Sequence, residues 1–137
     1  MERIRIITSG TSALWDLMSE CQKMMPQLQL LGHSSDGCEL YGLLDQFKPH
    51  VVLLEIVEDF PSALIVIETI NSKFAGSSIV VIAHELDVWQ IQTALRSGAM
   101  AYLLWPIPVD RLTSAVQLVH AGKMMLPAEA LTLLFPT

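Results

Sequence analysis

The chain has 137 residues, a formal net charge of −6 at pH 7 and 52% hydrophobic residues. This length is sufficient for one domain with its own core, without a disulfide or metal to stabilise it. Only eight residues are lysine or arginine, which argues against nucleic-acid binding by this segment. No apolar run approaches the roughly 20 residues of a membrane-spanning helix, and the first residues do not resemble a signal peptide.

The two cysteines, Cys21 and Cys38, are too few and too far apart for a disulfide framework or a zinc site. We expect both to be structural and the compartment to be the reducing cytoplasm. We expect no cofactor and no metal. The histidines are dispersed and are expected in surface or loop roles: His33, His50, His84 and His120.

The N-terminal half alternates strand-like and helix-like segments. Apolar residues predict a strand at 3–7, and the hydroxyls and glycine of 8–12 predict a turn in which Ser12 caps the next helix. That helix has apolar residues at helical spacing and ends at Pro26. A second strand is predicted at 27–32, a helix capped by Asp36 up to Phe47, and a third strand at 51–56.

The C-terminal half continues this alternation. The segment SALIVIETI at 62–70 is rich in β-branched residues, but it lies between two apolar strands. Because parallel strands need a crossover, usually a helix, we predict a helix that starts at Phe60. Strands are then predicted at 79–83 and 101–104, with helices at 87–97, 108–121 and 127–134.

Five strand–helix units predict an α/β fold with a doubly wound, five-stranded parallel sheet in the order 2-1-3-4-5 and helices on both faces. Such flavodoxin-like sheets bind ligands beyond the carboxyl ends of strands one and three. Glu55 lies there, at the end of an apolar strand. The loop TSGTS at 8–12 has the hydroxyls of a flavin phosphate loop, but a helix cap explains it better, and a P-loop motif is absent.

Two phrases carry a family resemblance: DGCELYGLLDQFKPHVVLLEI at 36–56 and ALRSGAMAYLLWPIPVDRLTSAVQLVHAGKMMLP at 94–127. They resemble the receiver domain of bacterial response regulators, the CheY-like fold, in the form found ahead of LuxR-type helix-turn-helix output domains. The resemblance covers residues 3–128. It implies a receiver-like domain at 3–122, followed at 123–137 by a C-terminal helix or the start of a linker to an output domain.

Receivers accept a phosphoryl group on an aspartate at the end of strand three, with a metal held by an acidic pair, and a hydroxyl and a lysine that contact the phosphoryl oxygens. The resemblance places Glu55 at the acceptor, Thr8 and Ser9 at the acidic pair, Ala83 at the hydroxyl and Trp105 at the lysine. One carboxylate beside two neutral hydroxyls is a poor magnesium site. We therefore expect a degenerate pseudo-receiver, with no catalytic residue and no enzymatic activity.

Two interpretations of Glu55 remain. The favoured one is a residual acidic residue at a solvated strand end; the other is an imitation of the phosphorylated state, for which Trp105 and Ala83 offer no pairing. Tyr102 lies where receivers have an aromatic switch, and with Ala83 beside it we expect one fixed rotamer. The Trp105 indole is expected to cover the crevice as an apolar plug, and the bond between Trp105 and Pro106 is a candidate for the cis form.

These expectations indicate a phosphorylation-independent regulatory or dimerisation domain of a two-component response regulator that controls transcription. The alternative is a stand-alone adaptor that binds a kinase or another protein.

Trp89 and Leu118 lie off the core stripes of their helices and are the interface candidates, on the face formed by helix 4, strand 5 and helix 5. The apolar C-terminal helix is a second candidate for dimerisation. We expect contact with DNA only through an output domain, and no contact with a membrane. The apolar residues of the C-terminal segment are Met124, Met125, Leu126, Leu131, Leu133, Leu134 and Phe135.

Overall fold

Five parallel strands form one sheet in the order β2-β1-β3-β4-β5, so the predicted doubly wound topology is confirmed. The computed structural model describes residues 3–134. The elements follow one another along the chain as β1 (Ile4–Ser9), α1 (Ser12–Met24), β2 (Leu28–Ser34), α2 (Gly37–Phe47), β3 (Val51–Glu55), α3 (Phe60–Lys73), β4 (Ser78–Ala83), α4 (Val88–Arg96), β5 (Ala99–Leu104), α5 (Val109–His120) and α6 (Ala128–Leu134).

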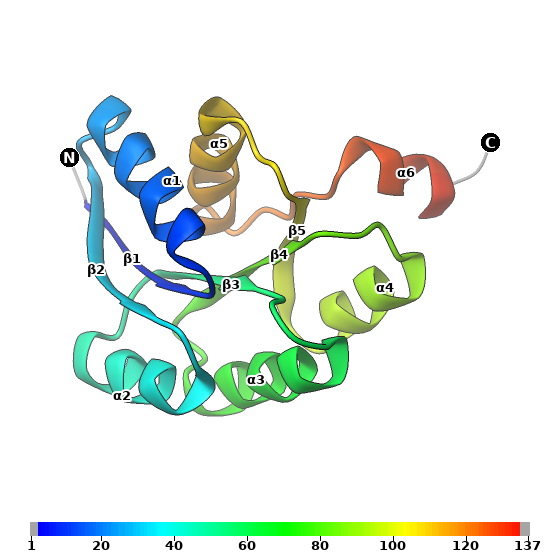
Figure 1. Cartoon of the computed structure of the whole chain (residues 1–137), viewed down its shortest axis with the longest axis horizontal. Helices are drawn as coiled ribbons and strands as arrows, with labels where there is room; N and C mark the ends of the chain where they lie inside the picture. Colours follow the sequence, from blue (N-terminus) through cyan, green and yellow to red (C-terminus); the bar gives the residue numbers. More distant parts are fainter. Residues whose placement is uncertain (1–2, 135–137) are drawn as a thin grey trace.

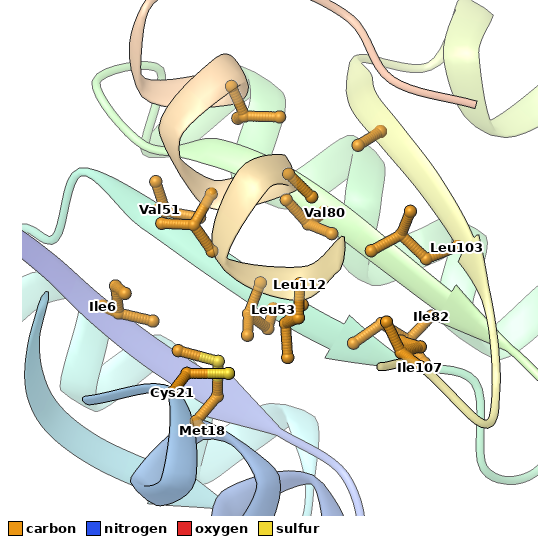
Figure 2. Packing of buried hydrophobic residues seen from close by; sticks show 14 of the residues in the cluster. Ile6, Met18, Cys21, Val51, Leu53, Val80, Ile82, Leu103, Ile107 and Leu112 are labelled. Carbon is orange, nitrogen blue, oxygen red and sulfur yellow. The ribbon is translucent and has the colours of Figure 1, made fainter. Parts of the chain in front are cut away.

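The helices cover both faces of the sheet. Helices α1 and α5 lie on one face and α2, α3 and α4 on the other (Figure 1). Figure 2 shows the first of the two resulting cores, where Leu53 of β3 meets Met18 of α1 and Leu112 of α5. Because successive strand residues point to opposite faces, Val52 and Leu54 belong to the second core. All five residues of β3 are buried, which explains the uninterrupted apolar run that ends on Glu55.

The β-branched segment at 62–70 is helical, as its position between two strands predicts. The Asp59 carboxylate accepts a hydrogen bond of 2.7 Å from the Ser62 N–H and caps the N-terminus of α3. Ile67 and Ile70 are fully buried on one side of this helix. Packing of this apolar face against the sheet therefore outweighs the weak helix propensity of the segment.

The segment after α5 packs against the β5 edge of the sheet. The Tyr102 N–H donates to the Met125 carbonyl at 3.0 Å, and the Met125 N–H donates to the Met100 carbonyl at 3.2 Å. Helix α6 then contacts α4, with Ala130 fully buried (Figure 1). Up to residue 134, the segment after α5 therefore docks on neighbouring elements of the same domain. The predicted apolar contribution of Phe135, and of the Leu133 and Leu134 side chains, lies outside the described part.

None of the helices within residues 3–134 has both the length and the apolar character needed to cross a membrane.

Gly98 ends α4 in a backbone conformation that other residues rarely adopt. Its φ angle is +122°, and an added Cβ would lie 2.5 Å from Asn71 Cγ. We therefore expect Gly98→Ala to lower the free energy of unfolding by about 1–3 kcal/mol, measured by urea denaturation.

Gly42→Ala is the matched control for this substitution. Gly42 lies within α2 and an added Cβ would meet no atom within 4 Å, so this change should raise stability by about 0.5–1 kcal/mol. A Gly98→Ala protein as stable as the wild type would contradict the described turn.

Candidate functional site

The Glu55 side chain is buried at the carboxyl end of β3, where it is only 1% exposed. The expectation of a residual acid at a solvated strand end is therefore wrong. Donors from two loops, on Thr11 and His84, reach its carboxylate. Burial of an ionised carboxylate is costly unless hydrogen bonds compensate for the lost water, which is the role these donors fill.

Both carboxylate oxygens of Glu55 accept hydrogen bonds. Oε1 accepts from the Thr11 N–H at 2.8 Å and from the Thr11 hydroxyl at 2.7 Å. Oε2 lies 2.7 Å from His84 Nε2, and since an ionised carboxylate can only accept, this ring nitrogen is the donor. Burial alone would raise the pKa of Glu55, but the hydrogen bonds from Thr11 and His84 outweigh it and hold the pKa below its ordinary value.

Thr11 and His84 are the two site residues that sequence reasoning did not select. Ser12 was expected to cap α1, but the N-cap position belongs to Thr11, which makes no side-chain cap hydrogen bond. Its hydroxyl is directed to Glu55 instead. His84 was expected in a surface or loop role; its side chain is 48% exposed, yet it pairs with Glu55. Their position in the sequence could have indicated them, because Thr11 follows β1 and His84 follows β4, and the carboxyl ends of both strands border the crevice.

Gly10 allows the loop after β1 to lie directly against Glu55. Its φ angle is +143°, and an added Cβ would lie 2.5 Å from Glu55 Cβ and 2.6 Å from Glu55 Oε1. Only glycine fits this conformation and this close approach. The Thr11 N–H therefore reaches the carboxylate because the residue before it has no side chain.

The hydroxyls at the acidic-pair position are buried and bonded to β2. Thr8 Oγ1 lies 2.6 Å from His33 Nδ1, and His33 Nε2 lies 3.1 Å from the Gly10 carbonyl. Because a carbonyl only accepts, His33 Nε2 donates to the Gly10 carbonyl. The Ser34 hydroxyl donates to Ser9 Oγ at 3.1 Å. Thr8 and Ser9 thus join β1 to β2.

Trp105 lies at the end of β5, half-buried against the first core. Its ring centroid is 6.1 Å from that of His84, so the indole lies beside the Glu55–His84 pair. The Trp105–Pro106 peptide bond is cis. Ala83, at the end of β4, is buried and has no side-chain hydrogen-bonding group.

Tyr102 is fully buried within β5. Its hydroxyl has no hydrogen-bond partner among residues 3–134. Burial, with a smaller contribution from the nearby Asp87 charge, raises the pKa of Tyr102 to about 12. The ring at the aromatic switch position is therefore enclosed and neutral.

The two interface candidates differ in exposure. Trp89 on α4 is 64% exposed and meets Phe60 of α3 edge to face, with ring centroids 5.8 Å apart. Leu118 on α5 is half-buried and offers less surface to a partner.

Two cavities border Glu55 and His84. One of about 220 Å³ is lined by Ser9, Glu55 and Asp59, and one of about 530 Å³ by Glu58, Ala83 and His84. In the described structure no lysine or arginine lines either cavity. Within 3–134, no group of three or more His, Cys, Asp or Glu side chains is arranged to hold a metal ion.

The sequence has relatives among curated transcription regulators, although no family model matches it. It is 32% identical over 112 residues to the nitrate/nitrite response regulator protein NarL of Escherichia coli, covering 80% of this chain and 50% of NarL. It is 25% identical over 124 residues to the transcriptional regulatory protein LnrK of Bacillus subtilis, covering 90% of this chain and 56% of LnrK. The chain thus spans about half the length of the curated relatives it matches.

Solved receiver domains have the same fold. The isolated REC domain of RcsB from Salmonella enterica serovar Typhimurium superposes with a TM-score of 0.87 at 16% identity, over 98% of this chain and 100% of that one. A LuxR-family two-component response regulator from Aurantimonas gives 0.84 at 15% identity, over 94% of this chain and 93% of that one. The chain has the fold of a response-regulator receiver domain. In sequence it is related to NarL and to regulators of that type.

We expect Glu55→Gln to be less stable than the wild type by about 1–3 kcal/mol at neutral pH, because the donors from Thr11 and His84 lose a charged acceptor. The folded-state pKa of Glu55 is lowered. The stabilisation is thus present above the unfolded carboxyl pKa of about 4.3 and is lost as pH falls through the lower folded-state pKa. Urea denaturation at a series of pH values should show that the difference in free energy of unfolding between the wild type and Glu55→Gln becomes smaller in this acid range.

Glu68→Gln serves as control, because Glu68 is exposed on α3. This change should alter the free energy of unfolding by less than about 0.5 kcal/mol at every pH. A stability difference for Glu55→Gln that does not depend on pH would show that the carboxylate charge is not what the two loops stabilise.

Proposed function

We propose that this receiver domain acts without phosphorylation, as a regulatory and dimerisation domain of a two-component response regulator that controls transcription. The observation that carries the proposal is the state of Glu55, whose two carboxylate oxygens already accept hydrogen bonds from Thr11 and His84. This residue ends β3, where the resemblance places the phosphoryl acceptor. An acceptor oxygen needs access to a phosphodonor, and a side chain that is 1% exposed offers little.

The surrounding residues support the same proposal. Magnesium in phosphoryl-transfer sites is usually held by carboxylates together with phosphate oxygens, whereas Thr8 and Ser9 are neutral and occupied by His33 and Ser34. The residues present do not fit a magnesium ion. At the end of β5, Trp105 supplies no positive charge for a phosphoryl oxygen.

Glu55 supports a permanent conformation of the crevice rather than a switch. Its negative charge is built into the chain, and it connects the loop after β1 to the loop after β4 through Thr11 and His84. Ala83 has no hydroxyl to move, and the Tyr102 ring is enclosed. We infer that the domain stays in one state and that Glu55 takes the structural place of a phosphorylated residue.

Self-association through the α4–β5–α5 face is the partner interaction that we propose. Trp89 gives this face an exposed aromatic side chain, the type enriched at interface hot spots. A structure of the similarly folded RcsB is described as two RcsB dimers bound to two parallel DNAs. By analogy, we propose that DNA contact belongs to an output domain and that the protein acts in the cytoplasm.

Phosphomimetic treatment tests the central proposal. With beryllofluoride and magnesium, we expect no NMR shift changes around Glu55, because both its oxygens are occupied and no described lysine or arginine lines the two adjoining cavities. With acetyl phosphate and magnesium, we expect no mass increase. The isolated RcsB REC domain, solved in the presence of beryllofluoride, is the positive control. A stoichiometric mass increase, or saturable shifts at Glu55, would reject phosphorylation independence.

Sedimentation analysis of Trp89→Ala tests the interface. We expect the wild type to dimerise and the variant to lose about 2 kcal/mol or more of dimerisation free energy. Ile65→Ala is the matched control, because Ile65 on α3 is equally exposed, at 64%, and lies outside the proposed face. Equal dimerisation of Trp89→Ala and wild type would exclude this anchor. A monomeric wild type would instead favour the stand-alone adaptor.

A further inference from the structure

A separate cavity of about 380 Å³ opens at the N-terminal edge of the sheet, at the other end of the strands from Glu55. It lies where β1 begins and where α2 and α3 end, and Arg5, Lys48 and Lys73 line it from these three elements. A volume of this order is sufficient for a small organic ligand. The functional site described above uses none of these residues.

The charge of this cavity is opposite to that of the whole chain. Three of the eight lysines and arginines line it in a protein with a net charge of −6, and its described lining includes no Asp or Glu. Lys48 and Lys73 are exposed and form no ion pair with any described residue. Cations that converge without acidic partners produce a local positive potential that favours an anion.

Arg5 and Lys48 are held in place by the backbone. The Arg5 guanidinium donates to the Phe47 carbonyl at 2.7 Å and to the Lys48 carbonyl at 2.6 Å. Further N–H donors remain on the same planar group, whose fork geometry suits phosphate and carboxylate oxygens. The Lys48 backbone is fixed as the C-cap of α2 by its N–H bond to the Leu44 carbonyl at 2.9 Å. The Arg5 guanidinium and the Lys48 backbone are therefore ordered before an anion binds, and binding has to order only the lysine side chains.

An aromatic ring forms part of the wall beside these charges. Phe74 is half-buried and stacks on Tyr41, with ring centroids 6.3 Å apart and 9° between the ring planes. Leu44 and Pro49, which are both buried, add apolar surface to the same lining. The cavity thus combines cations with a flat apolar wall.

A purely structural role of the cations has to be weighed against binding. The C-termini of α2 and α3 carry partial negative charge, and basic residues at helix C-termini offset it. Arg5 already donates hydrogen bonds to the carbonyls at the C-terminus of α2. Offsetting a helix dipole, however, requires neither a cavity nor an aromatic wall beside the lysines.

We propose that this cavity binds a small organic anion, in which a phosphate group contacts Arg5, Lys48 and Lys73 and a flat ring lies against Phe74. The site is independent of the function proposed above. It gives the domain a place to sense a phosphorylated ring compound while the crevice at Glu55 stays unchanged.

The test titrates the whole chain with phenyl phosphate and follows backbone amide NMR shifts. We expect saturable shifts at Lys48, Gly76 and Ser77, all of which line the cavity. Phenol, which lacks the charge, and inorganic phosphate, which lacks the ring, should each bind at least about tenfold more weakly. Glu55→Gln should bind phenyl phosphate as the wild type does, because Glu55 lies outside this cavity.

Charge removal provides the matched variants. The double variant Lys48→Gln/Lys73→Gln should weaken phenyl phosphate binding about tenfold or more, while Lys123→Gln, an exposed lysine outside the cavity, should leave it unchanged. The wild type, the double variant, Lys123→Gln and Glu55→Gln are compared by thermal unfolding to verify folding. Absence of saturable shifts, equal binding of inorganic phosphate, or equal weakening by Lys123→Gln would each overturn the proposal. Loss of stability without any binding would assign the cations to helix capping alone.

Discussion

The buried carboxylate of Glu55 is the interaction on which the arrangement of the crevice depends. An ionised group that is 1% exposed is stable only if donors replace the water it has lost, and Thr11 and His84 supply these donors from two different loops. The loop after β1 comes this close because Gly10 has no side chain to meet Glu55. Removing His84 would leave Oε2 of the buried Glu55 carboxylate without this donor, so Glu55 and its partners form one unit rather than independent contacts.

The fold could be predicted almost completely, because its signals are local and repeated. The apolar run before Glu55 indicates a strand covered on both faces, and β3 is buried along its whole length. Asp36 caps α2 as expected, accepting from the Glu39 N–H at 2.8 Å. The segment at 62–70 was ambiguous in composition, but the need for a crossover between parallel strands decided it correctly. Each of these inferences uses residues that are neighbours in the chain.

For the site, only the positions of the residues that end the strands could be predicted. The residues that end the strands, Thr8, Ser9, Glu55 and Ala83, lie where the topology requires. The partners of Glu55 could not be predicted, because Thr11 is 44 residues away in sequence and His84 is 29 residues away, and no local pattern links them. The N-cap of α1 was predicted one residue too late, at Ser12 instead of Thr11, and the Thr11 hydroxyl bonds to the distant Glu55 carboxylate rather than capping the helix. Burial of Glu55 was missed for the same reason. Acidic residues are rarely buried without partners, and because the distant donors could not be predicted, a solvated carboxylate was expected.

The backbone pairing of Met125 with β5 has a consequence for how copies of this domain can assemble. β5 is an outer strand, and the outer strand of a sheet offers unpaired N–H and C=O groups to any other chain that can extend the ladder. Met125 occupies such groups on Met100 and Tyr102 from within the same molecule. Continuous sheet formation between molecules is therefore obstructed along this border, and contact between copies there is left to side chains on the helices.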